Sequence, residues 1–122
     1  MFRKHFAGFD LAGAESARNP ALLRSEFMPL LEQCINIIIH AGEDEDVQNI
    51  WEAVYHLSAD RIGHGLTLAK NPQLMERFIN QKITLEMCPS SNFQIVGYRN
   101  FLIETTSGLP VYPLKDFCNY SA

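Results

Sequence analysis

The stretch IIIHAGE at residues 37–43 decides the fold that we predict for this chain. Its three isoleucines form a short apolar run, which is typical of a strand buried on both faces. The run ends abruptly in an imidazole, a glycine and a carboxylate. Parallel α/β folds present reactive groups in this way, at the carboxyl ends of buried strands. We therefore expect a parallel sheet that carries His40 and Glu43 at its functional edge.

Three other segments share this pattern of a short apolar run closed by a glycine or a polar turn. Roughly 25 residues separate successive strand ends, which is the size of one βα unit, and a series of such units implies a parallel sheet. The sequence therefore predicts an α/β fold in a single domain covering residues 1–122. The four expected strands cover residues 6–11, 35–40, 61–65 and 83–87, and they end near Gly13, His40, His64 and Pro89.

Helical patterns fill the intervals between these strands. The expected helices cover residues 21–34, 47–57 and 72–79, and an Asn-Pro pair precedes the first and the third as a cap and a first helical residue. Pro29 predicts a kink or a division into two shorter helices in the first. Beyond Asn92 we expect a long loop over residues 93–110 and a final helical stretch. In the third helix the residues expected to face inward are Leu74, Met75, Phe78 and Ile79.

Composition limits the classes of partner. The 122 residues are 47% hydrophobic with a net charge of −4, which favours one buried core and argues against nucleic acid as a partner. No apolar run approaches the roughly 20 residues that a membrane span needs. The three cysteines are odd in number and widely spaced, which favours reduced thiols in a cytoplasmic protein.

His40, Glu43 and His64 are the candidates for chemistry. An imidazole at a strand end can bind a metal ion, and a nearby carboxylate can donate or accept a proton. Two histidines that end neighbouring parallel strands converge on one cavity. The alternative for each is structural: a capped strand end for His40 and Glu43, and a tight turn for His64 between its two glycines.

Gly13, in the segment DLAGAE at residues 10–15, is a candidate for substrate binding because a glycine lets a backbone N–H approach a ligand closely. A simple turn glycine is an equally good interpretation. Cys88 is interpreted as a buried thiol rather than as a nucleophile or metal ligand, because no partner residue lies near it in the sequence.

The series GFDLAGAE, IIIHAGE, RIGHG and LEMCPSSN, in this order and spacing, closely resembles the adenosine deaminase family. The resemblance extends from about Phe6 to about Lys115. It implies that the chain is a partial TIM barrel, in which these motifs are the fourth to seventh strands of a (β/α)8 barrel.

The resemblance also implies a role for each candidate in zinc-dependent deamination of a purine nucleoside. His40 matches a zinc ligand, and Glu43 matches the glutamate that protonates the purine ring. His64 matches the histidine beside the metal-bound water, and Gly13 matches the glycine whose backbone contacts the purine.

Two motifs of the family are missing from this sequence. The H-x-H pair that supplies two zinc ligands is absent, and so is the T-D-D or T-D-N motif that supplies a metal-binding aspartate. Since a catalytic zinc site needs at least three protein ligands, we expect a truncated or partial enzyme that is inactive alone. The alternatives are an inactive purine-binding module that self-associates through its open sheet edges, a related deaminase of adenine or N6-substituted purines, and a new metal site using His40 and His64.

Overall fold

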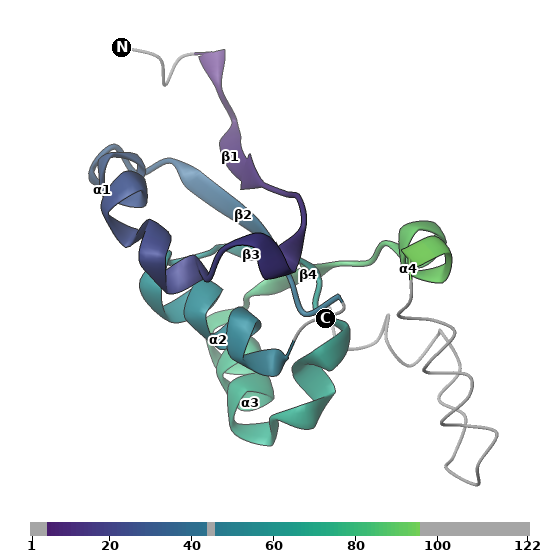
Figure 1. Cartoon of the computed structure of the whole chain (residues 1–122). Helices are drawn as coiled ribbons and strands as arrows, with labels where there is room; N and C mark the ends of the chain where they lie inside the picture. The colour runs from purple at the N-terminus through teal and green to yellow at the C-terminus, as the bar shows by residue number, and fades with distance from the viewer. Residues whose placement is uncertain (1–4, 44–45, 96–122) are drawn as a thin grey trace, which may run out of the picture.

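Four parallel strands form one open sheet in the computed structural model, which describes residues 5–43 and 46–95 (Figure 1). They lie in the order β1-β2-β3-β4, so each strand pairs with its neighbour along the chain. The prediction of a parallel α/β sheet is confirmed. The strands are β1 (Gly8–Leu11), β2 (Asn36–Ala41), β3 (Arg61–His64) and β4 (Thr84–Glu86).

Helices connect the strands, as the sequence predicted. In Figure 1, α1, α2 and α3 follow one another along one side of the sheet, and α4 lies beyond the end of β4. Helices on one side are what right-handed crossovers between neighbouring parallel strands produce. The helical elements are η2 (Glu15–Ala17), η3 (Pro20–Leu23), α1 (Arg24–Glu32), α2 (Val47–His56), η4 (Leu66–Lys70), α3 (Pro72–Gln81) and α4 (Pro89–Ile95).

The core lies between the central strands and the helices. Ile37 and Ile39 of β2 are almost fully buried, together with Ile62 of β3 and Ile50 of α2. Ile38, which points to the opposite face of β2, is only partly buried. The expectation that this run is buried on both faces is therefore wrong for the described residues, because they cover one face of the sheet.

Both predicted Asn-Pro caps are present. The side chain of Asn19 accepts a hydrogen bond from the N–H of Ala21 at 2.7 Å, and that of Asn71 accepts one from Leu74 at 3.0 Å. Each cap satisfies a backbone donor that a helix start leaves unpaired, and the proline that follows has no N–H to satisfy.

Three details of the helices differ from the predictions. Pro29 lies inside α1, so the alternative of two shorter helices is wrong, while the kink stays a prediction. Ile79 is 59% exposed, so it does not face inward with Leu74 and Phe78. Residues 89–95 form α4, where a turn and a loop were expected. The predicted structure beyond residue 95 lies outside the described residues.

The register between β2 and β3 positions the functional edge of the sheet. His40 is paired with Gly63, and Ala41 is paired with His64. A Cβ atom at Gly63 would lie 2.9 Å from the Cγ and Nδ1 atoms of the His40 ring. The ring of His40 can therefore lie across β3 only because residue 63 has no side chain.

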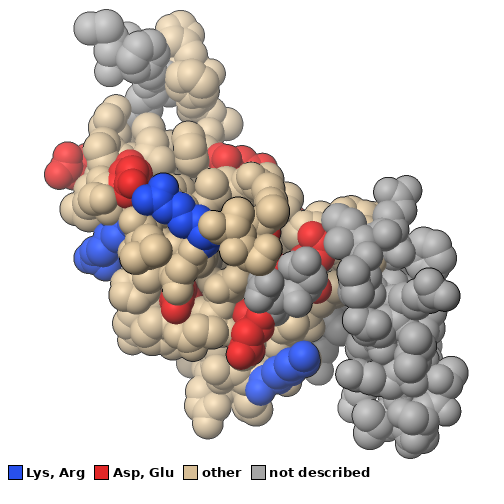
Figure 2. Space-filling model, in the orientation of Figure 1, with Lys and Arg blue, Asp and Glu red and all other residues tan. Residues whose placement is uncertain are grey.

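No helix among the described residues is long and apolar enough to cross a membrane. Figure 2 shows acidic and basic side chains interspersed over the visible face of the described residues.

The exposure of Ile79 can be tested against a buried neighbour in the same helix. We expect Leu74→Ala to lower the free energy of unfolding by about 2–5 kcal/mol, because it leaves a cavity under α3. Ile79→Ala is expected to change it by less than about 0.5 kcal/mol. Urea denaturation measures both, and a loss in Ile79→Ala as large as that in Leu74→Ala would contradict the observed orientation of α3.

Candidate active site

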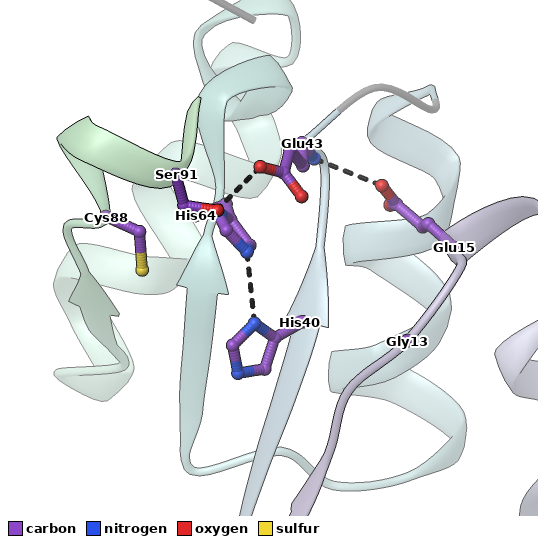
Figure 3. Close-up of a pocket in the computed structure, with 7 residues that line it drawn as sticks. All are labelled: Gly13, Glu15, His40, Glu43, His64, Cys88 and Ser91. Atoms are coloured by element: carbon purple, nitrogen blue, oxygen red, sulfur yellow. Dashed lines mark hydrogen bonds and ion pairs between the residues drawn. The ribbon is translucent and has the colours of Figure 1, made fainter. Parts of the chain in front are cut away.

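A cavity of about 420 Å³ opens at the carboxyl ends of the strands (Figure 3). The structure brings together all four residues that the sequence singled out, since Gly13, His40, Glu43 and His64 all line this cavity. They come from the segments after β1 and β2 and from the last residues of β2 and β3. Parallel strands present their carboxyl ends at one edge, which is why residues far apart in sequence meet here. The remaining lining residues are Glu15, Cys88 and Ser91.

The two histidines are in direct contact. Nδ1 of His40 lies 3.0 Å from Nε2 of His64, and the ring centroids are 5.0 Å apart (Figure 3). On the other side of the His40 ring, Nε2 lies 3.4 Å from Oδ1 of Asp10. His64 is 6% exposed, whereas the His40 side chain is 27% exposed. His40 is therefore the histidine that a ligand in the cavity can reach through a free ring edge.

An unusual backbone conformation turns His64 into the cavity. His64 is paired with Ala41, so regular strand alternation would point its side chain toward the helices. Its φ angle of 68° lies in the left-handed region instead, and the ring contacts His40. Such a conformation costs a non-glycine residue about 1–3 kcal/mol and concentrates at functional sites.

Glu43 holds a carboxylate inside the cavity wall. Its side chain is 15% exposed, and Oε1 lies 3.4 Å from Nδ1 of His64. The Oε1 atom is buried without a hydrogen-bond partner among the described residues. A buried carboxylate oxygen in this state gains free energy from any hydrogen-bond donor that reaches it. Glu43 is therefore placed to exchange a proton with a bound ligand.

Glu15 also lines the cavity and is not among the candidates that the sequence predicts. Its carboxylate accepts a hydrogen bond from the backbone N–H group of Glu43 at 3.1 Å (Figure 3). It also accepts hydrogen bonds from the backbone N–H group of Gly42 and from the side chain of Asn49. Glu15 thus ties the segment after β1 to the loop that carries Glu43. Its position in the DLAGAE motif, two residues after Gly13, is the signal in the sequence that points to it.

Asn92 is the second residue that was missed. It lies in α4, its side chain is 1% exposed, and its Oδ1 lies 2.6 Å from Nδ1 of His64. The sequence predicts a polar turn at the end of β4 in the surrounding SSN segment, whereas the structure places Asn92 in α4.

Gly13 and Cys88 complete opposite sides of the cavity. Gly13 has a φ angle of 141°, which residues with a side chain rarely adopt, and among the described residues no atom beyond its chain neighbours lies within 4 Å of where its Cβ would be. The backbone of Gly13 is therefore open to a ligand. The Cys88 thiol lies 3.4 Å from the carbonyl oxygen of Glu86 and lines the cavity, so it is partly buried and not the fully buried thiol that was predicted.

The described residues do not form a complete metal site. The donor chemistry is suitable, since Nε2 of His40 reaches the cavity and the Asp10 carboxylate lies beside it. Within residues 5–43 and 46–95, however, no three side chains of His, Cys, Asp or Glu are grouped closely enough to hold a metal ion. These residues therefore do not fit a catalytic zinc by themselves.

The fold and the cavity place the chain in the class of TIM-barrel amidohydrolases. The crystal structure of an adenine deaminase from Arthrobacter aurescens matches it with a TM-score of 0.69 at 29% identity, over 74% of this chain and 28% of that one. An amidohydrolase from Burkholderia ambifaria, solved with bound zinc, matches with a TM-score of 0.66 at 27% identity, over 71% of this chain and 24% of that one. The prediction of a partial TIM barrel is confirmed.

Sequence comparison gives the family. The family model for adenosine deaminase matches residues 1–117, so the chain belongs to the adenosine deaminase family. It is 32% identical to the adenosine deaminase of Vibrio parahaemolyticus, over 97% of this chain and 33% of that enzyme. It is 35% identical to that of Photorhabdus laumondii, over 94% of this chain and 32% of that enzyme. The chain thus spans about a third of the length of these curated relatives.

The role of Glu15 can be tested by hydrogen exchange. We expect Glu15→Ala to increase the exchange rates of the Gly42 and Glu43 amides, because their N–H groups lose the carboxylate that accepts them. The expected loss in unfolding free energy is about 1–3 kcal/mol. The matched control is Glu26→Ala, since the Glu26 carboxylate is exposed and pairs with Ser25 and Arg18 away from the cavity. Unchanged amide exchange in Glu15→Ala would show that the loop holds its position without Glu15.

Proposed function

We propose that this chain forms the substrate-facing part of a zinc-dependent adenosine deaminase. The complete enzyme would hydrolyse adenosine and deoxyadenosine to inosine and deoxyinosine, in purine salvage in the cytoplasm. One observation carries the proposal: Gly13, His40, Glu43 and His64 line a single cavity at the carboxyl ends of the strands. Family membership agrees with it. The proposed partner is a purine nucleoside, and neither a nucleic acid nor a membrane is part of the proposal.

Each residue is proposed to have a separate task. Glu43 would donate a proton to the purine ring nitrogen, which removes the negative charge that builds up as the ring loses its aromaticity. The open backbone of Gly13 would contact the purine. His40 would bind zinc through Nε2, and the zinc would supply hydroxide by lowering the pKa of water to about 7.

His64 is proposed to orient the attacking water. A neutral imidazole has one nitrogen lone pair, and in this structure Nε2 of His64 faces Nδ1 of His40. The role therefore requires this contact to open when water enters the cavity. Both histidines line the same cavity, so a change in the His40 side chain would open the contact next to space that water can enter.

The catalytic site is proposed to be completed by polypeptide outside this sequence. The sequence contains neither an H-x-H nor a T-D-D or T-D-N motif, and the described residues do not gather three metal ligands. The open sheet edges of β1 and β4 are where additional strands would pair. A second copy of this chain could pair there, but it would add neither missing motif.

Adenine is a second candidate substrate. The similarity to the adenine deaminase from Arthrobacter aurescens favours it, at a TM-score of 0.69. Adenine and adenosine present the same amino-bearing ring to the proposed proton donor, so the described residues serve both.

We expect the isolated chain, supplied with zinc, to form no inosine from adenosine above the uncatalysed background. The reason is the incomplete ligand set, since catalytic zinc sites have three protein ligands. A spectrophotometric deamination assay with adenosine and adenine measures this. Inosine formation that disappears in Glu43→Gln would show that the chain is a complete enzyme.

A chimaera tests the positive part of the proposal. In it, this chain replaces the equivalent third of the adenosine deaminase of Vibrio parahaemolyticus. We expect the chimaera to deaminate adenosine or adenine, and Glu43→Gln to lower kcat by about 10²–10⁴-fold while zinc stays bound. His40→Gln is expected to lose zinc as well as activity.

The matched control in the chimaera is Glu76→Gln, because Glu76 is exposed on α3. It should leave both kcat and zinc content unchanged. A folded, zinc-loaded chimaera whose activity is insensitive to Glu43→Gln would refute the proposed role of Glu43.

A further inference from the structure

We propose that Asn92 is a positioning residue that holds His64 in the tautomer with the proton on Nδ1, so that Nε2 of His64 presents its lone pair to His40 and to the cavity. This inference deepens the proposed function and rests on it for its catalytic meaning. Its structural part depends only on contacts within the described residues.

The side chains of Asn92 and His64 are in direct contact. Oδ1 of Asn92 lies 2.6 Å from Nδ1 of His64, and both side chains are buried, at 1% and 6% exposure. An amide oxygen is only an acceptor, so the imidazole nitrogen that faces it must carry the proton. A short hydrogen bond in the protein interior is stronger than a longer one at the surface, where water can replace it.

The nitrogen and oxygen of the Asn92 amide could exchange places, and Glu43 distinguishes the two orientations. Oε1 of Glu43 lies 3.4 Å from the same Nδ1 atom of His64. Two oxygen atoms therefore converge on this nitrogen, and lone pairs face one another there unless Nδ1 carries the proton. With the amide reversed, the Asn92 NH2 group would force Nδ1 to accept, and the lone pair of Nδ1 would then face the Glu43 oxygen.

The tautomer of His64 determines the tautomer of His40. With the proton on Nδ1, a neutral His64 accepts at Nε2, and the atom 3.0 Å away is Nδ1 of His40. His40 must therefore donate from Nδ1, which leaves the lone pair of its Nε2 atom free. That atom is the proposed metal ligand, so the amide of Asn92 determines the ligand atom two rings away.

Asp10 is the competing group. Its Oδ1 lies 3.4 Å from Nε2 of His40 and would favour the opposite tautomers of both rings. Its side chain is 52% exposed, whereas Asn92 is almost completely buried and its contact is 0.8 Å shorter, 2.6 Å against 3.4 Å. The shorter and more buried contact, between Asn92 and His64, therefore determines the tautomers of both rings.

The test is a two-bond 1H–15N correlation spectrum of the full chain labelled with 15N, recorded without zinc or substrate. The spectrum is recorded at about pH 8.5, which favours neutral imidazoles. Substitution of each histidine by Gln assigns the ring signals. In the unsubstituted chain we expect His64 to show a protonated Nδ1 and an unprotonated Nε2. The opposite pattern would overturn the proposal without any variant.

Variants then identify the controlling group. Asn92→Leu is expected to shift the tautomer ratio of His64 by about tenfold toward Nε2–H, because it removes the acceptor. Asn92→Asp keeps an oxygen at the same place and is expected to keep the proton on Nδ1. The controls are Ser90→Leu, on the exposed side of α4, and Asp10→Asn, and both should leave the ratio unchanged.

Two results would overturn the proposal at this stage. An unchanged ratio in a folded Asn92→Leu chain would assign the control to Glu43, and a shift in Asp10→Asn would assign it to Asp10. Asn92→Ala replaces Asn92→Leu if the larger side chain prevents folding, which the backbone amide spectrum reports. The tautomer is measured without zinc or substrate. A result that contradicts the role of Asn92 is therefore distinct from failure of the chimaera to deaminate adenosine or adenine.

Discussion

The register between β2 and β3 is the constraint on which the site depends. Because β2 and β3 are parallel and end at the same level of the sheet, His40 lies opposite Gly63 and the two histidines lie at the ends of neighbouring strands. A shift by one residue would send each side chain to the other face of the sheet. The buried isoleucines of β2 and β3 prevent that shift, since they would leave the core together. The packing of the hydrophobic face therefore also fixes the geometry of the polar edge.

Polar groups from four segments then hold this edge together. Glu15 comes from the segment after β1, Glu43 from the loop after β2, His64 from the end of β3 and Asn92 from the helix after β4. Each contacts at least one of the others through a side chain or a backbone N–H group. The site is a network between successive βα units, which explains how partly exposed loops hold reactive groups in place.

The sequence predicted the parallel sheet and the convergence of four site residues, because strand ends are marked locally by apolar runs that stop at glycine and histidine. It did not predict Glu15 and Asn92, because each acts on a partner about 28 positions away in the chain. The exposure of Ile79 was also missed. Helical periodicity identifies an apolar stripe, but the packed part of the stripe depends on what lies opposite.

Gly63 shows that a residue without a side chain can belong to the machinery of a site. It contributes no atom to the chemistry, yet any larger residue would meet the ring of His40. A survey of substitutions that scores only activity would therefore rank Gly63 beside the reactive residues. The same survey scored by the abundance of folded protein would separate the steric requirement at Gly63 from the chemical requirement at the reactive residues. A side chain at Gly63 would meet the His40 ring, whereas a reactive side chain can be replaced without such a clash.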